Sequence, residues 1–242
     1  MSTKTRALTV DGIEVDVVRK NIKNLHLAVY PPDGRVRVAA PLAVNDDAVR
    51  MAVATRLPWI KRRRASFVLQ ERQSRREYVS GESHYYLGRR YLLDVIEHNG
   101  TGRVVVRTGK HIDLFVTEGS DREKREGVFQ RWYRNELRRM AAPVIREWAE
   151  HLRLPEPLWG IKRMKTRWGS CNAEAGRIWL NLELIKKPTV CLDYIVVHEL
   201  VHFLERHHND RFVSLMDKAM PLWRSNRDVL NSAPLAHEDW SY

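Results

Sequence analysis

The feature that most constrains this chain is the run YIVVHELVHFLERHH at residues 194–208, in which a His-Glu-x-x-His motif lies among apolar residues. If this run is helical, His198 and His202 are four residues apart and project from one face, where both imidazoles can bind the same metal ion. Glu199 then lies beside that face, where it can take a proton from a metal-bound water instead of binding the metal. The motif therefore predicts a helix that carries part of a metal-dependent hydrolytic site.

The residues around the motif predict that this helix is buried, because apolar side chains surround it on nearly all sides. A polar group left unpaired in an apolar interior costs about 1–3 kcal/mol, whereas a metal site would use both histidines and the glutamate. The alternative is a pair of core histidines that hydrogen-bond to the backbone, with Glu199 at the surface. We favour the metal site. The apolar neighbours are Tyr194, Ile195, Val196, Val197, Leu200, Val201, Phe203 and Leu204.

A catalytic zinc usually takes three protein ligands, so the motif predicts a third one nearby. His208 stands ten residues after His198, the spacing of the longer H-E-x-x-H-x-x-G-x-x-H pattern, but Glu205 replaces the glycine at which that pattern turns. Asn209 reads as the cap of a following helix, and a helix break before it can return one histidine to the metal. We favour His208, which adjoins the cap, and keep His207 as the alternative.

Composition indicates a globular chain and excludes several classes of protein. The chain has 242 residues and 43% hydrophobic content, enough for one large or two small domains. The N-terminus has no apolar signal region, and no apolar run approaches the roughly 18 residues of a membrane span, so we expect a cytoplasmic protein without membrane contact. Cys171 and Cys191 are too few for a disulfide scaffold, and we expect free thiols.

The formal net charge of +12, with a pI of about 9.9, raises nucleic acid as a partner. The basic residues crowd two regions, 56–76 and 162–167, without an aromatic-interleaved recognition motif. Such clusters are usually solvated helix faces, and they can also attract acidic or phosphate-bearing substrates.

The remaining pattern predicts an α+β fold. Residues 1–120 form a β-rich N-terminal region with one basic helix, which begins after Asn45 and continues through residues 61–64. Residues 121–242 form the hydrolase domain, which opens with a long helix from about residue 122 that Pro143 should kink or split. Residues 161–171 and 177–182 then read as an antiparallel hairpin. The strands expected in the first region are 13–18, 25–29, 36–40, 85–88, 91–95, 104–106 and 112–116.

In its ordered motifs the chain resembles the YgjP-like metallopeptidase family, which is related to the SprT-like zincins. The motifs are Arg167-Trp168-Gly169-Ser170-Cys171, Ile178-x-Leu180-Asn181-x-x-Leu184, DYIVVHELVH at 193–202 and His208-Asn209-x-x-Phe212, with Pro32-Asp33-Gly34, Trp59-Ile60, Ser80-Gly81-Glu82 and Tyr86-Leu87-Gly88-Arg89 before them. The resemblance implies zinc ligands at His198, His202 and His208, a general base at Glu199, and a zincin-like helical catalytic core behind the β-rich region.

We therefore expect a hydrolase that uses zinc (Zn2+), first of all a metallopeptidase acting on peptide or protein, in which Glu199 activates a zinc-bound water. A zinc hydrolase of a nucleotide phosphate is the first alternative. The second is a module that binds nucleic acid or protein and holds a structural metal, but a base beside the metal argues against it. Arg167, Asn181 and Tyr194 are polar and near the motif in sequence, and each is more often structural than catalytic.

Overall fold

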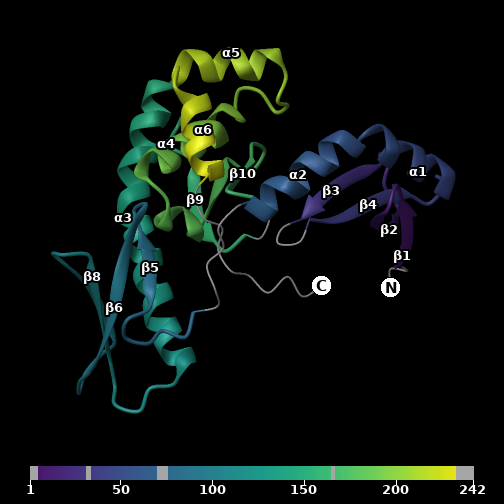
Figure 1. The fold of residues 1–242 in the computed structure, drawn as a ribbon. Coiled ribbons are helices and arrows are strands. Elements are labelled where there is room, and N and C mark those ends of the chain that lie inside the picture. Colours follow the sequence, from purple (N-terminus) through teal and green to yellow (C-terminus); the bar gives the residue numbers. More distant parts are fainter. Residues whose placement is uncertain (1–4, 31–33, 70–75, 165–166, 233–242) are drawn as a thin grey trace. The chain divides into compact units, whose positions relative to one another are not determined.

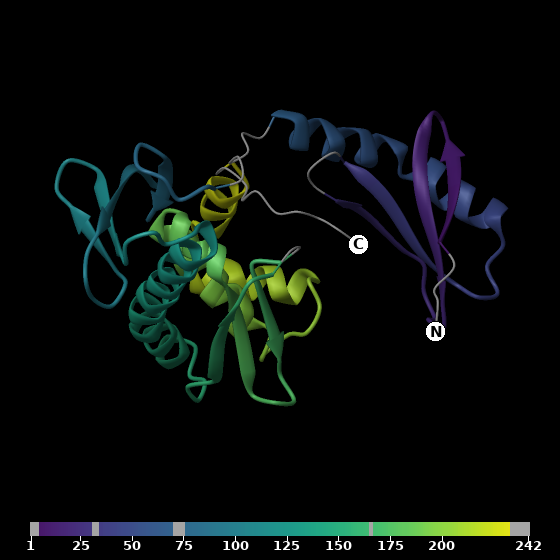
Figure 2. The same cartoon turned by 90° about the horizontal axis from the view of Figure 1, so that it is seen from below.

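A computed structural model describes residues 5–30, 34–69, 76–164 and 167–232, drawn as ribbons in Figures 1 and 2. The chain forms two compact units, residues 1–72 and residues 73–242. It mixes strands with six α-helices in the described ranges, and the N-terminal region is rich in strands. These units meet at residue 72, whereas the sequence pattern places a domain boundary after residue 120. The hydrolase domain at residues 121–242 stays a prediction. No helix in the described ranges is long and apolar enough to cross a membrane.

The first unit is a four-stranded sheet with two helices. Its strands are β1 (Thr5–Val10), β2 (Ile13–Lys20), β3 (His26–Tyr30) and β4 (Arg35–Pro41), in the order β1-β2-β4-β3. The hairpin of β3 with β4 is confirmed as antiparallel, although its turn at 31–33 lies outside the described residues. We had not predicted β1, although Asp11 and Gly12, both with positive φ, are the turn residues that a two-residue hairpin favours.

The single basic helix predicted after Asn45 is wrong, because the structure has two. Helix α1 (Asp46–Thr55) begins at the Asn45 cap, whose side chain accepts from the Ala48 N–H at 2.8 Å, and ends before Arg56. Helix α2 (Leu57–Leu69) then carries the basic run. Pro58 explains the break, because it falls in the first turn of α2, where its missing N–H would have no helical partner anyway.

The second unit begins with a sheet that packs on one long helix. Strands β5 (Ser83–Tyr86), β6 (Arg89–Glu97), β7 (Arg103–Arg107) and β8 (His111–Val116) have the order β5-β6-β8-β7. They confirm the four strands predicted there, except that the strand expected at 85–88 ends at Tyr86, because Leu87 and Gly88 form a turn with positive φ. Helix α3 (Arg122–His151) packs against β7 and β8. It runs unbroken through Pro143, which excludes the split, one of the two outcomes expected there, and leaves the kink a prediction. Pro143 is exposed, which leaves the orphaned carbonyl of the preceding turn open to water.

A three-stranded sheet follows, with β9 (Leu158–Lys162), β10 (Gly169–Asn172) and β11 (Arg177–Asn181) in the order β10-β11-β9. The hairpin is confirmed only for β10 and β11, which pair antiparallel. Residues 161–162, expected in its first strand, belong instead to β9, which pairs parallel with β11. Strand β10 consequently lies at an edge of this sheet.

Four more elements complete the second unit: η1 (Leu182–Lys186), α4 (Thr189–Val201), α5 (Asp210–Ala219) and α6 (Trp223–Ser232). Helix α4 is central, since it packs against α3, α5, α6, β10 and β11. One hydrophobic core joins these elements to the face of α3, with fully buried residues such as Leu137, Ile145, Leu180, Val196 and Leu200. This packing holds α4 and the edge strand β10 in place beside each other.

Candidate metal centre

Helix α4 carries the His-Glu-x-x-His motif and is buried, as predicted. It begins after Pro188, which lacks an N–H, and ends at Val201, so that His202 is its C-terminal cap. Because most side chains on this helix are apolar and buried, packing on several sides stabilises it, and not one face alone. The buried residues are Cys191, Leu192, Tyr194, Ile195, Val196, Val197, Glu199, Leu200 and Val201.

The chain turns back directly after α4 without the glycine of the longer pattern. Backbone N–H groups of Phe203 and Leu204 donate to the carbonyls of Leu200 and Val201 at 3.0 and 2.9 Å, and Glu205 also donates to Val201 at 2.9 Å. Glu205 does not need a positive φ in this turn, which explains how it can replace glycine. Asn209 then starts α5 by accepting from the Phe212 N–H at 3.0 Å, as its predicted capping role requires.

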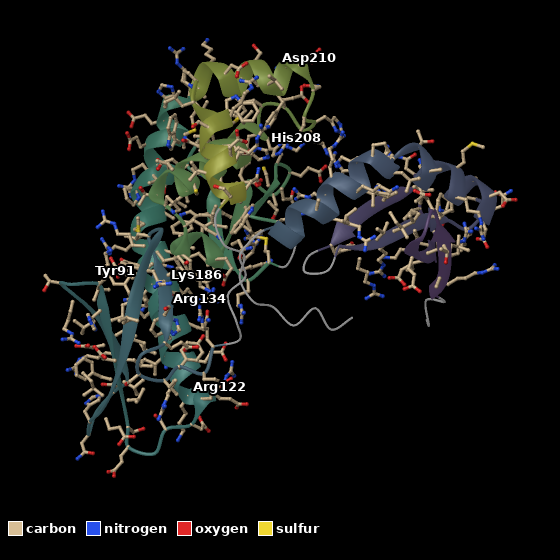
Figure 3. The ribbon with its side chains drawn as sticks, in the orientation of Figure 1. Tyr91, Arg122, Arg134, Lys186, His208 and Asp210 are labelled. Carbon is tan, nitrogen blue, oxygen red and sulfur yellow. The ribbon has the colours of Figure 1, made fainter. Side chains whose placement is uncertain are left out.

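This turn brings His208 to His198 and His202. One potential ligand atom from each of the three residues lies within 4.8 Å of the others. The ring centroids are 4.7–4.9 Å apart, and Nε2 of His208 lies 3.0 Å from Nε2 of His198. Figure 3 labels His208 in the segment that leads into α5. His207 is exposed, its N–H donates to the Glu205 carboxylate at 3.1 Å, and it does not join this group.

The three imidazoles fit a borderline-soft divalent metal such as zinc, for which neutral imidazole is a common ligand. His202 Nδ1 lies 3.1 Å from the Glu205 carbonyl, a contact that assigns the proton to Nδ1 and leaves Nε2 free to bind a metal. The Phe212 ring lies 4.7–5.0 Å from all three imidazoles and walls the group on one side. Burial, followed by the two neighbouring histidines, lowers the pKa of His198 to about 3. The imidazole of His198 is therefore neutral and can offer a ring nitrogen lone pair to a metal.

Glu199 lies beside this group and is buried, with 5% of its surface exposed, so the alternative of a surface carboxylate is wrong. Burial raises the pKa of Glu199 to about 8, and the guanidinium of Arg167 acts in the opposite direction. A buried carboxylate without a strong partner has a high affinity for a proton. That is the property which a general base near a polarised water requires.

A cavity of about 880 Å³ opens over the histidines and Glu199. Its walls come from the edge strand β10, from α4, from the turn before α5, and from α6. Tyr194 and Arg167, two of the polar residues singled out in the sequence, line this cavity. The site residues on α6 were not predicted, although the spacing of the buried Trp223 and Leu230 marks an amphipathic helix there. These unpredicted lining residues include Arg227, Leu230 and Asn231.

Asn181, the third polar residue singled out, is a structural residue at the end of β11. Only 4% of it is exposed. Its Nδ2 donates to the carbonyls of Met164 and Arg167, each at 2.8 Å. Its Oδ1 accepts from the N–H groups of Met164 and Glu183 at 3.3 and 3.2 Å. Asn181 therefore fixes the segment that leads into β10 at the edge of the cavity.

We expect Asn181→Ala to destabilise the fold by about 2–6 kcal/mol, because it removes four hydrogen bonds of which each contributes roughly 0.5–1.5 kcal/mol. Urea unfolding followed by circular dichroism measures this. Asn172→Ala is the matched control on the same hairpin, since Asn172 is exposed and accepts one bond, from the Ala175 N–H at 3.1 Å. A loss below about 1 kcal/mol in both variants would contradict the structural role of Asn181.

Comparison with known proteins adds a family to this geometry. A family model described as YgjP-like, metallopeptidase domain, matches residues 23–233, which is most of the chain and includes every residue of the site. A search of the curated proteins finds no match.

Proposed function

The chain belongs to the YgjP-like metallopeptidase family, and from this premise we propose that it is a zinc metallopeptidase. In this proposal His198, His202 and His208 hold the metal and Glu199 is the general base. One observation carries it: three imidazoles converge within 4.8 Å beside a buried carboxylate. A buried carboxylate with no role in chemistry would only cost stability, so the combination favours a catalytic metal over a structural one.

Zinc, when bound, supplies Lewis-acid chemistry, which makes water acidic enough to attack near neutral pH and polarises the carbonyl under attack. Glu199 accepts the proton of the attacking water through its carboxylate. It then delivers that proton to the nitrogen of the leaving amine as the C–N bond breaks. The Phe212 ring and the neighbouring apolar residues of α4 exclude bulk water from one side of the group. With α4 and the β10–β11 hairpin beside it, we interpret this arrangement as a zincin-like core.

The edge strand β10 favours an extended peptide as the substrate. Within the described part of the chain β10 pairs with β11 on one side only, and its residues line the cavity over the histidines. An extended peptide can add to such an edge through backbone hydrogen bonds, which places a peptide bond over the metal site for many different sequences. Peptide or protein is therefore the partner that we propose.

A second candidate is a zinc hydrolase of a nucleotide phosphate. The observation that favours it is the lining of the cavity by Arg167, Arg206 and Arg227, which come from three different segments of the chain. Guanidinium groups bind phosphate oxygens in a bidentate manner. The same arginines would also bind carboxylate groups of an acidic peptide, so the cavity charge alone does not separate the two substrates.

A turnover assay separates them. The protein is stripped of metal, reloaded with zinc, and incubated with a mixed peptide library and with the four nucleoside triphosphates. We expect zinc-dependent cleavage of peptides, detected by mass spectrometry, and no turnover in the stripped sample. Zinc-dependent release of phosphate or pyrophosphate without peptide cleavage would overturn the peptidase and support the second candidate.

A further inference from the structure

The carboxylate of Glu199 lies directly against the backbone of Gly169, the first residue of β10. A Cβ atom built on Gly169 would lie 2.5 Å from Oε1, 2.7 Å from Cγ and 2.9 Å from Cδ of Glu199. The three nearest atoms all belong to this one side chain. These distances are well below ordinary van der Waals contact, so a side chain at position 169 and the present position of Glu199 exclude each other.

The need for glycine here is one of space and not of backbone conformation. Gly169 lies outside the left-handed region, whereas Gly12, Gly34, Gly81, Gly88, Gly109, Gly119 and Gly176 all have positive φ. It sits in regular antiparallel pairing, opposite Leu180 of β11. An alanine could therefore adopt the same φ and ψ without strain. The alanine side chain would, however, displace the side chain of Glu199.

The strand that presents Gly169 is held firmly. The Asn181 N–H donates to the carbonyl of Trp168 at 2.9 Å, directly before Gly169, and the side chain of Asn181 holds Arg167 at 2.8 Å. On the other side, Glu199 emerges from α4, which is buried nearly all round. The carboxylate is thus confined between a fixed helix and a fixed strand, and the same strand forms the edge over the cavity.

We infer that Gly169 is a positioning residue for the general base: its bare Cα lets the carboxylate of Glu199 rest on the strand edge that aligns the substrate. This inference rests on the proposed function for the role of Glu199 and of that edge. Strand β10 then positions both the carboxylate of Glu199 and the peptide bond of the substrate. Gly169 thereby fixes the distance between these two groups, although Gly169 itself does not touch the reacting atoms. A misplacement of about 1 Å at a reacting group costs on the order of 10²-fold in rate.

The test is Gly169→Ala in the full chain, reloaded with zinc. A carboxylate is the movable end of a flexible side chain, so we expect it to shift and the protein to remain folded. We expect kcat for peptide cleavage to fall by about 10²-fold, with KM and zinc content close to those of the wild-type protein. Gly127→Ala on α3 is the matched control, because a Cβ there meets nothing within 4 Å. It should leave kcat unchanged.

A second measurement does not need activity. If Gly169→Ala instead destabilises the protein, that loss should disappear when Gly169→Ala is combined with Glu199→Ala, because the clashing side chain is then gone. A crystal structure of Gly169→Ala should show the Glu199 carboxylate displaced and the three histidines in place. Full kcat in Gly169→Ala, or a destabilisation that persists in the double variant, would overturn the inference. Absence of zinc-dependent turnover in the wild-type protein would instead overturn the proposed function and leave the stability comparison and the crystal structure valid.

Discussion

Glu199→Gln is expected to reduce turnover by about 10²–10⁴-fold while the protein keeps its zinc, since that is the usual contribution of general acid–base catalysis. Gln has nearly the same size and shape as Glu, and it fits the space beside Gly169. It cannot accept the proton of the attacking water. Both kcat and kcat/KM should fall together, because the lost interaction belongs to the transition state and not to substrate binding.

The measurement is steady-state cleavage of the best peptide found for the wild-type protein, with metal content determined on the same samples. Glu174→Gln is the control, because Glu174 is an exposed carboxylate that lines the same cavity. It should retain most of its turnover. If zinc-dependent turnover survives in Glu199→Gln at the wild-type rate, Glu199 is not the base and the proposed mechanism fails.

The part of this site that was predictable from sequence is the part that is local in the chain. His198, Glu199 and His202 share one short helix, so their relative placement follows from helix geometry and the apolar residues around them. The placement of His208 beside these histidines requires only that the chain turn back within the six residues after His202. The Asn209 cap indicates where the next helix begins. By contrast, the stack of Tyr194 on Trp223, with ring centroids 6.3 Å apart, joins residues whose proximity depends on packing of the whole second unit. The spacing of residues along the sequence does not predict such a contact.

Two prolines show the same limit in the fold. Pro58 lies in the first turn of α2, just after the break from α1, whereas Pro143 lies inside a helix of 30 residues. The sequence pattern predicts the reverse of what is found, with one helix running through Pro58 and a kink or split at Pro143. The difference comes from tertiary contacts, because α3 buries side chains along its whole length, such as Phe129, Leu137 and Ile145. That burial outweighs the cost of one lost hydrogen bond, roughly 3 kcal/mol for an interior proline.

Gly169 is an example of the same kind at the site itself. In the sequence it falls inside the first strand predicted for the hairpin, residues 161–171. Glycine is needed at this position because Glu199, thirty positions later, occupies the space that a Cβ atom would need. A single sequence does not contain the information that these two positions meet, and packing of α4 on β10 supplies it.

His208→Ala is expected to lose most of the bound zinc, because it removes one of three protein ligands. Loss of a residue that only hydrogen-bonds to a metal ligand already lowers metal affinity by roughly 10–100-fold. Loss of a ligand itself should lower the affinity further. Zinc per chain, measured after gel filtration against a weak chelator, is the readout. Metal that binds only the folded chain also raises its melting temperature, so the stabilisation by added zinc seen in the wild-type protein should shrink in His208→Ala.

His207→Ala is the matched variant that makes this result specific. Both histidines lie in one exposed segment, both substitutions remove one imidazole, and only His208 has a ring nitrogen 3.0 Å from His198. We expect His207→Ala to keep its zinc and its response to zinc in thermal unfolding. The opposite pattern, with metal lost from His207→Ala and kept by His208→Ala, would mean that the segment before α5 rearranges when metal binds. The turn held by Val201 and by the Asn209 cap argues against such a rearrangement, because it fixes His208 at both ends before any metal arrives.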